Sequence, residues 1–218
     1  MNDEPVKLLT IGGSDSGGAY GVQADLKTFT ALGGHGMSAL TVVTAQNSVG
    51  VLGVEWLTAV FLAKQLDAVL GDYGAAAAKT GFLGRVDYIE TIIAKLAEYG
   101  VPHLVVDPVF VNHHGDPMFP PEVIAAYRQQ LFPLATVVTP NKHEVALLTN
   151  TPLEELASWE GMQTAVSQLH ALGCQHVLFK GFVDGEAQLD VLFDGTSWTT
   201  FRAPRLNTRN VAGSGDPL

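Results

Sequence analysis

The sequence predicts an α/β fold with three layers, in which helices cover both faces of a mostly parallel central sheet. Short runs rich in β-branched residues alternate along the chain with segments whose apolar residues recur every three or four positions. Such alternation is typical of strand–helix–strand units, whose strands run parallel. The 218 residues, 47% of them hydrophobic, can form one core, so we expect a single domain.

The expected strands are short apolar runs that stop at glycine, proline or a polar residue. They cover residues 6–11, 39–45, 77–80, 104–107, 136–139 and 176–180, and a hairpin follows at 188–193 and 197–201. The expected helices have one apolar face each. They cover 22–32, 56–70, 88–99, 122–131, 142–148 and 161–172. Ligands of parallel sheets bind beyond the carboxyl ends of the strands. The informative residues there are Asp15, Gln46, Asp107, Asn141 and Lys180.

Composition excludes several classes of function. Twelve basic residues against 22 acidic ones give a net charge of −10, which does not favour a nucleic-acid-binding surface. No run approaches the roughly 18 apolar residues of a membrane span, and the first residues lack the pattern of a signal peptide. Cys174 is the single cysteine and is expected in the core, so an internal disulfide and a cysteine-based zinc site are excluded. These features favour a cytoplasmic protein that binds small molecules.

Two glycine-rich segments are candidate binding loops. Residues 12–18 follow the first strand, and glycines let the backbone turn sharply and approach a ligand. Taken alone, this segment fits a plain strand-to-helix loop equally well. Near the C-terminus, the N–H groups of Gly213, Ser214 and Gly215 would form an anion hole if a helix begins there. Asp216 would then take a proton from an attacking hydroxyl, although such a tetrapeptide is more often a simple turn.

The segment after the strand 136–139 suggests a phosphate and metal site. Asn141 can cap the following helix with Glu144 three residues later, which is a purely structural role. Alternatively, both residues hold Mg²⁺ through water together with Asp107, because Mg²⁺ prefers oxygen ligands and keeps several waters. Lys180 ends another strand and would neutralise phosphate oxygens.

Taken in order, these motifs resemble the ribokinase-type fold, and within it the hydroxymethylpyrimidine/phosphomethylpyrimidine kinases of thiamine synthesis and their pyridoxal kinase relatives. The resemblance covers essentially the whole chain, and the ordered set of motifs is specific although each motif alone is not. The matching segments are residues 11–18, 21–28, 44–47, 79–81, 107–109, 139–141 with Glu144, and 180–181.

The resemblance implies ATP-dependent phosphorylation of a hydroxymethyl group, with Mg²⁺ as the metal. Gln46 would hydrogen-bond the substrate ring and its amino group, and Phe82 and Val109 would line the ring pocket. Gly13 would bring its backbone near the substrate, and Asp25 would support the site from the following helix. Residues for ATP and Mg²⁺ would be Asp107, Asn141, Glu144 and Lys180, with the anion hole at 213–215 and Asp216 as base. Homodimers formed through sheet edges occur in such families, so a homodimer is a further expectation.

Three departures from the family pattern bear on function. Asp216 stands where the pyrimidine kinases commonly have cysteine, and it matches pyridoxal kinases and ribokinases instead. Tyr20 adds a phenol beside the substrate, where it would either stack on the ring or shrink the pocket. The family continues past the position of Leu218 into further helices, so we expect the 218 residues to be one kinase domain that lacks them.

Several alternatives stay open at this stage. Phosphorylation of the pyrimidine monophosphate is a second activity that the resemblance allows. Asp216 favours pyridoxal or pyridoxine, or a ribokinase-type sugar or nucleoside, as the substrate, whereas the missing helices suggest a catalytically silent ligand-binding domain. His113 and His114 favour a loop over the site rather than a zinc site, because they have no cysteine partner.

Overall fold

The computed structural model describes residues 4–112 and 115–204. The chain forms two compact units that divide between Leu104 and Val105. Both units combine a twisted set of mostly parallel strands with packed helices, so the predicted α/β fold with a mostly parallel sheet is confirmed. The expectation of one domain that lacks its C-terminal helices stays a prediction.

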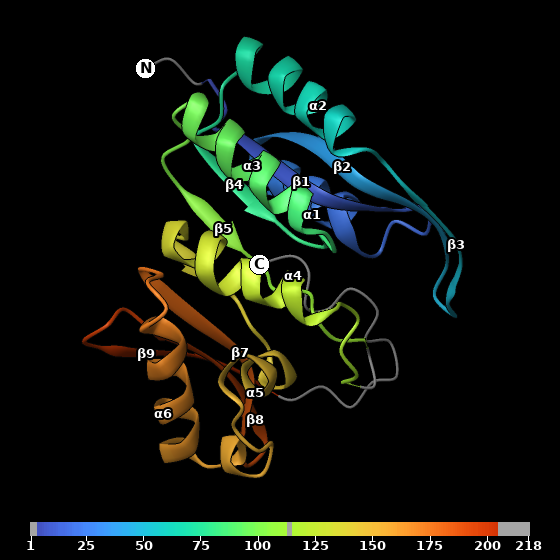
Figure 1. Cartoon of the computed structure of the whole chain (residues 1–218). Helices are drawn as coiled ribbons and strands as arrows, with labels where there is room; N and C mark the ends of the chain where they lie inside the picture. Colours follow the sequence, from blue (N-terminus) through green and yellow to red (C-terminus); the bar gives the residue numbers. More distant parts are fainter. Residues whose placement is uncertain (1–3, 113–114, 205–218) are drawn as a thin grey trace. The chain divides into compact units, whose positions relative to one another are not determined.

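The first unit has four strands in the order β3-β2-β1-β4. Strand β1 (Lys7–Asp15) pairs in parallel with β2 (His35–Gln46) and with β4 (Ala77–Thr80). Strand β3 (Val51–Trp56) pairs with β2 in the antiparallel direction. The helices are α1 (Gly21–Ala31), α2 (Ala59–Asp72) and α3 (Val86–Glu98), and Figure 1 shows α2 and α3 side by side against these strands. The carboxyl ends of β1, β2 and β4 therefore meet at one edge.

Helix α2 illustrates why these segments fold as they do. The Thr58 hydroxyl accepts a hydrogen bond from the Phe61 N–H at 3.1 Å and so caps the first turn. Leu62, Leu66 and Leu70 recur at a spacing of four and are all buried. A capped helix with one apolar stripe gains its stability by burying that stripe.

Strand β3 corrects the expected helix 56–70. The helix begins at Ala59, and Trp56 instead ends a strand that forms a hairpin with β2. The side chain of Asn47 accepts hydrogen bonds from the N–H groups of Val49 and Gly50, which shapes the hairpin turn. Every residue of β3 is exposed, so the strand lacks the alternation of buried and exposed residues that predicts a strand from sequence.

The second unit has five strands in the order β5-β6-β7-β8-β9. Strands β5 (Leu104–Val106), β6 (Val137–Val138) and β7 (His176–Asp184) are parallel, whereas β8 (Ala187–Phe193) and β9 (Trp198–Pro204) are antiparallel to their neighbours. The helices are α4 (Pro121–Ala126), α5 (Lys142–Thr149) and α6 (Trp159–His170). A π-helical turn (Tyr127–Leu131) and 3₁₀ turns (Phe132–Leu134 and Glu155–Ala157) complete the unit.

The predicted β8–β9 hairpin is confirmed, and a second hairpin precedes it. The Asp194 carboxylate accepts hydrogen bonds from the N–H groups of Thr196 and Ser197, at 2.8 and 2.6 Å, which fixes the β8–β9 turn. The expected strand 176–180 continues to Asp184 and turns back at Gly185, which has a positive φ of 59°. The sequence missed this extension because Val183 and Asp184 are exposed.

Two further expectations concern isolated features. Cys174 is only 2% exposed, as predicted for a core residue. Among the helices that the structure describes, none combines the length and the apolar character that crossing a membrane requires.

Candidate functional site

The glycine-rich loop after β1 is organised by one buried carboxylate. Asp15 accepts hydrogen bonds from the N–H of Gly17 at 2.7 Å and from the N–H groups of Ala19 and Tyr20 at 2.9 Å each. Gly21 has a positive φ of 58°, and a Cβ there would lie 2.2 Å from the Gly13 carbonyl oxygen. Hydrogen bonds and close backbone packing therefore fix the conformation of this loop. Tyr20 lies at its end, in the N-cap position of α1.

Gln46, predicted to hold the substrate ring, is fastened to this loop. Ser16 Oγ donates to the Gln46 carbonyl oxygen at 2.7 Å and accepts from the Gln46 N–H at 2.8 Å. Thr44 Oγ1 lies 2.9 Å from the Ser14 carbonyl oxygen and 3.2 Å from Gln46 Oε1. The end of β2 is thus fixed to the end of β1 through two hydroxyl groups that the sequence did not single out.

Gly13 and Phe82, also predicted ring-binding residues, lie beside each other in the same unit. A Cβ at Gly13 would lie 3.0 Å from Val42 Cγ1 and 3.9 Å from Phe82 Cβ, so the backbone passes close to both. The Thr41 hydroxyl donates to the Phe82 carbonyl oxygen at 2.8 Å, and the rings of Phe82 and Trp56 are 5.8 Å apart. The carboxyl ends of β1, β2 and β4 therefore bring Gly13, Gln46 and Phe82 to one edge of the first unit.

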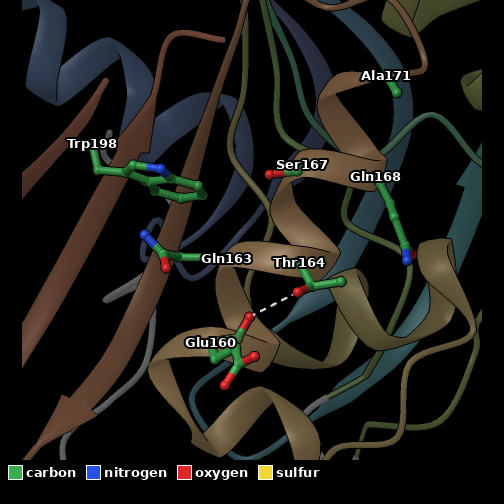
Figure 2. Close-up of a pocket in the computed structure, with 7 residues that line it drawn as sticks. All are labelled: Glu160, Gln163, Thr164, Ser167, Gln168, Ala171 and Trp198. Carbon is green, nitrogen blue, oxygen red and sulfur yellow. Dashed lines mark hydrogen bonds between the residues drawn. The ribbon is translucent and has the colours of Figure 1, made fainter. Parts of the chain in front are cut away.

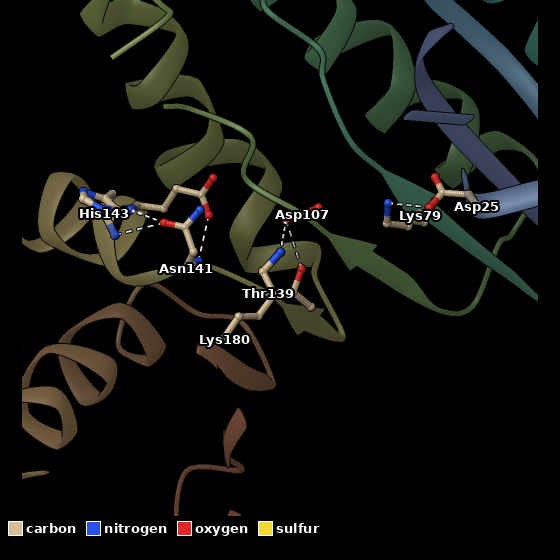
Figure 3. A network of polar contacts seen from close by, with 8 residues as sticks. Asp25, Lys79, Asp107, Thr139, Asn141, His143 and Lys180 are labelled. Atoms are coloured by element: carbon tan, nitrogen blue, oxygen red, sulfur yellow. Dashed lines mark hydrogen bonds and ion pairs between the residues drawn. The ribbon is translucent and has the colours of Figure 1, made fainter. Parts of the chain in front are cut away.

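Asp25, predicted to support the substrate site, is closed within a buried polar set. Its carboxylate accepts a hydrogen bond from Lys79 Nζ at 2.7 Å (Figure 3) and another from the Thr10 hydroxyl at 2.6 Å. All three residues are buried. We call these three residues the Asp25 set. The carboxylate supports helix α1 and the strands beneath it. Lys79 was missed, although a lysine in an alanine-rich strand signals a buried ion pair.

A second set with the same three residue types lies in the second unit, and we call it the Asp107 set. Lys180 Nζ donates to Asp107 Oδ1 at 3.0 Å, and the Thr139 hydroxyl donates to the same oxygen at 3.3 Å (Figure 3). Asp107 follows β5, Thr139 follows β6, and Lys180 lies in β7. The carboxyl ends of parallel strands meet at one edge, so this unit brings two of the predicted phosphate-site residues together.

Asn141 and Glu144 form the capping box that the sequence predicted. Asn141 Oδ1 accepts from the N–H groups of His143 and Glu144, at 2.9 and 3.1 Å. Glu144 Oε2 accepts from the Asn141 N–H at 2.8 Å. Asn141 also forms a parallel bridge with Lys180, which ties the start of α5 to β7. The cap fixes the position of the Glu144 carboxyl group.

Glu144 is buried, and its pKa is raised well above the usual range. Burial is the main cause, because it disfavours the charged form, and the nearby charge of Asp107 adds to it. The charge of Lys180 and backbone hydrogen bonds from Asn141 and Phe110 oppose this shift. The region therefore holds a carboxyl group that a divalent cation would help to ionise.

The donor set fits Mg²⁺ through water. Asn141 Oδ1 is committed to two N–H groups, so the carboxylates of Asp107 and Glu144 are the suitable ligands. Mg²⁺ in nucleotide sites commonly uses one or two carboxylates, several waters and the phosphates. No cluster of three or more histidine, cysteine, aspartate or glutamate residues able to hold a metal occurs in residues 4–112 and 115–204. The predicted histidine loop includes His113 and His114, which lie outside the described residues.

The remaining predicted residues are placed only in part. Val109 lies in the second unit, half-buried after β5, and its N–H donates to the Asp107 carbonyl oxygen at 3.0 Å. Gly213, Ser214, Gly215 and Asp216 lie outside the described residues. A surface groove between α6 and β9 contains none of the predicted residues; Trp198 and Gln163 are among the side chains that line it (Figure 2).

Comparison with known proteins agrees with this arrangement. Residues 15–218 match the sequence profile of the phosphomethylpyrimidine kinase family. The chain is 43% identical over 218 residues to a hydroxymethylpyrimidine/phosphomethylpyrimidine kinase of Mycobacterium bovis, covering 98% of this chain and 78% of the relative.

Solved structures give the same result. The crystal structure of a phosphomethylpyrimidine kinase from Clostridium difficile matches with a TM-score of 0.82 and 36% identity, covering 90% of this chain and 84% of that one. The ADP complex of Bacillus subtilis pyridoxal kinase matches with a TM-score of 0.85 and 35% identity, covering 97% and 80%. The predicted resemblance is thereby confirmed: the chain belongs to the phosphomethylpyrimidine kinase family.

Proposed function

We propose that the protein transfers the γ-phosphoryl group of ATP to the hydroxymethyl group of 4-amino-5-hydroxymethyl-2-methylpyrimidine, for thiamine biosynthesis. Its monophosphate is proposed as a second acceptor. The observation that carries the proposal is the Asp107 set together with the cap of α5 beside it. A lysine, the carboxyl groups of Asp107 and Glu144 and a helix N-terminus come together there. Membership of a kinase family supports the same activity.

Lys180 and Asn141 are proposed to bind the ATP phosphates. Lys180 Nζ donates to Asp107 Oδ1 at 3.0 Å, and the positive charge of its ammonium group would neutralise phosphate oxygens. Asn141 uses its side-chain oxygen for the cap, which leaves its amide nitrogen to donate to a phosphate. Asp107 and Glu144 would hold Mg²⁺ through water, and the metal would neutralise charge on the phosphates.

The first unit is proposed to bind the ring. Gln46 would hydrogen-bond the pyrimidine and its amino group, Phe82 would pack against the ring, and Gly13 would bring its backbone close to it. Tyr20 would stack on the ring or narrow the pocket. Val109 is a further ring-binding residue that is proposed on the resemblance alone.

The base and the anion hole are assigned by resemblance. Asp216 would accept the proton of the attacking hydroxyl, while the N–H groups of Gly213, Ser214 and Gly215 would stabilise charge on the transferred phosphoryl group. Asp216→Asn in the full-length protein should lower kcat by orders of magnitude while substrate binding is retained.

A pyridoxal kinase is the second candidate. Asp216 matches the residue of that group, and Bacillus subtilis pyridoxal kinase is 35% identical to this chain. Measured rates of ATP-dependent phosphorylation of the hydroxymethylpyrimidine, pyridoxine and pyridoxal separate the two candidates. The pyrimidine should be the better substrate, and no turnover on any of the three would refute the kinase proposal.

A homodimer in the cytoplasm completes the proposal. Strand β3 is the edge strand of the first unit, and Val51, Leu52 and Val54 are 54%, 80% and 45% exposed. Exposed apolar edge strands favour pairing with another chain. Light scattering should give twice the mass of one chain.

A further inference from the structure

Thr44 and Gln46 are placed as a pair by the geometry of β2. Residues two apart in a strand project on the same face. The pairing of β2 with β1 shifts between Gly12 and Gly13, so Thr41 is the extra residue of a bulge. Beyond this bulge, Ser14 and Asp15 pair with Val43 and Thr44. The bulge therefore sets which side chains of β2 meet the glycine-rich loop, as is common next to binding sites.

The backbone of Gln46 is fixed independently of its side chain. Ser16 Oγ bonds both the N–H and the carbonyl oxygen of Gln46. The remaining freedom of Gln46 lies in its side-chain torsions. The amide group has two different ends, since its oxygen only accepts and its nitrogen only donates. Which end a ligand meets therefore depends on what holds the other end.

The single hydroxyl proton of Thr44 decides which end of the Gln46 side-chain amide faces Thr44. Thr44 Oγ1 lies 2.9 Å from the Ser14 carbonyl oxygen and 3.2 Å from the position given to Gln46 Oε1. The oxygen and nitrogen of an amide group have nearly the same shape, so which of them faces Thr44 is decided by the hydrogen bonds they make. A hydroxyl has one proton, so it cannot donate to two oxygens at once. The Ser14 carbonyl oxygen is the nearer partner, and it cannot rotate because it belongs to the backbone of β1. Both contacts are satisfied together only when Thr44 donates to Ser14 and accepts from the amide nitrogen of Gln46.

The opposite orientation loses a hydrogen bond. If Thr44 donated to the Gln46 oxygen, the Ser14 carbonyl would lose its hydroxyl donor in a half-buried position. Losing one such bond favours the first orientation by roughly tenfold. Gln23 provides a comparison, because the Asp15 N–H donates to its oxygen at 2.9 Å and its nitrogen donates to Ser14 Oγ at 2.7 Å. Both amides at this edge are then oriented by the β1 end.

We propose that Thr44 is a positioning residue that holds the nitrogen of the Gln46 amide and thereby presents its oxygen to the substrate. Within the described residues, no hydrogen bond engages the other end of this amide. The inference rests on the proposed role of Gln46 in ring binding. An oxygen presented in this way accepts from a ring amino group and rejects a ring that offers only an acceptor there. Thr44 thus determines specificity without touching the substrate.

A pair of matched ligands tests this orientation. The 4-amino compound offers a donor, and its 4-methoxy analogue keeps the ring and hydroxymethyl group but offers only an acceptor. Dissociation constants for both would be measured by calorimetry without nucleotide. Wild type should bind the amino compound at least about tenfold more tightly. Thr44→Val should lower this preference by about tenfold, because the amide is then free to turn, and Thr44→Ser should restore it.

Thr30→Val is the matched control, since it removes a threonine hydroxyl that donates to Leu26 within helix α1. This variant should keep the wild-type preference. An unchanged preference in Thr44→Val would overturn the inference while leaving the proposed function intact. Equal or tighter binding of the methoxy compound by wild type would overturn it as well, even if Thr44→Val failed to fold. If wild type bound neither pyrimidine, the proposed function would fall, and the inference with it.

Discussion

The Asp25 set and the Asp107 set use the same three residue types and differ in how tightly they are closed. Asp25 accepts from lysine and threonine at 2.7 and 2.6 Å, whereas the corresponding distances to Asp107 are 3.0 and 3.3 Å. The side chain of Lys79 is 6% exposed and that of Lys180 is 13% exposed. A further buried carboxyl group, that of Glu144, lies beside the Asp107 set.

The difference teaches how to separate a structural ion pair from a binding one. The Asp25 carboxylate is buried and accepts a short hydrogen bond on each oxygen, so its role is to hold strands and helix α1 together. The Asp107 set has longer hydrogen bonds and lies beside the buried carboxyl group of Glu144, which suits it to binding charged ligands. Residue type alone does not distinguish them, but distance, exposure and the neighbouring charges do.

Lys79→Met should give the largest effect on stability. The substitution leaves Asp25 buried without its cation, which should lower the free energy of unfolding by about 3–5 kcal/mol. Urea unfolding measures this change. The double variant Asp25→Leu/Lys79→Met is the control, because it removes both charges and should recover much of the loss. A double variant no more stable than Lys79→Met would contradict this account of the Asp25 set.

Lys180→Met should instead act mainly on catalysis. Loss of a cation at the phosphates should lower kcat by about 10²- to 10³-fold. The free energy of unfolding should fall less than in Lys79→Met, because Lys180 is more exposed and Thr139 still donates to Asp107. Steady-state kinetics and urea unfolding of the two variants together check this. Equal destabilisation by both substitutions would remove the distinction between the two sets.

Glu144→Gln should change how stability depends on pH. The unfolded glutamate releases its proton near pH 4.5, whereas the folded one keeps it until its raised pKa. In that window the unfolded state binds fewer protons, so wild-type stability falls with rising pH, by up to about 1.4 kcal/mol per pH unit. Glutamine does not titrate. Unfolding curves with a metal chelator should show wild type losing stability relative to the variant as pH rises; a constant difference would contradict the raised pKa.

The smallest expected change in the free energy of unfolding comes from replacing two buried threonines, Thr10 and Thr80. Thr10→Val removes a hydrogen bond to a charged group and should lower the free energy of unfolding by about 1.5–3 kcal/mol. Thr80 Oγ1 is buried and, in the described part of the chain, has no hydrogen-bond partner. Thr80→Val should therefore be neutral or stabilising. Thermal unfolding of the pair checks this, and similar losses for both would show that the Asp25 hydrogen bond adds little.

Much of the fold could be predicted because buried apolar residues recur at a regular spacing along helices and strands. The buried face of α3 follows directly from the spacing of its apolar residues. Strand β3 could not be predicted in this way, because all of its residues are exposed and its pairing is set by the Asn47 turn. The extension of β7 to Asp184 has the same cause.

The candidate site could be predicted by its residue types but not by its contacts. Asp107 directly follows β5, and Asn141 caps α5 shortly after β6, in the region where ligands of parallel sheets bind. Glu144 lies in the first turn of α5, and Lys180 lies in β7. The partner of Asp25 could not be predicted, because Lys79 is 54 residues away in sequence. The contact made by the Thr44 hydroxyl depends on the bulge between β1 and β2, and no pattern of residues in the sequence predicts that bulge.

The most direct test of the account is ATP-dependent phosphorylation of 4-amino-5-hydroxymethyl-2-methylpyrimidine by wild type and by Lys180→Met, followed by mass spectrometry. The account predicts that wild type forms the pyrimidine monophosphate together with ADP, and that Lys180→Met, although folded, forms it at least about a hundredfold more slowly. Absence of phosphorylated product with wild type, or equal rates for the two proteins, would contradict it.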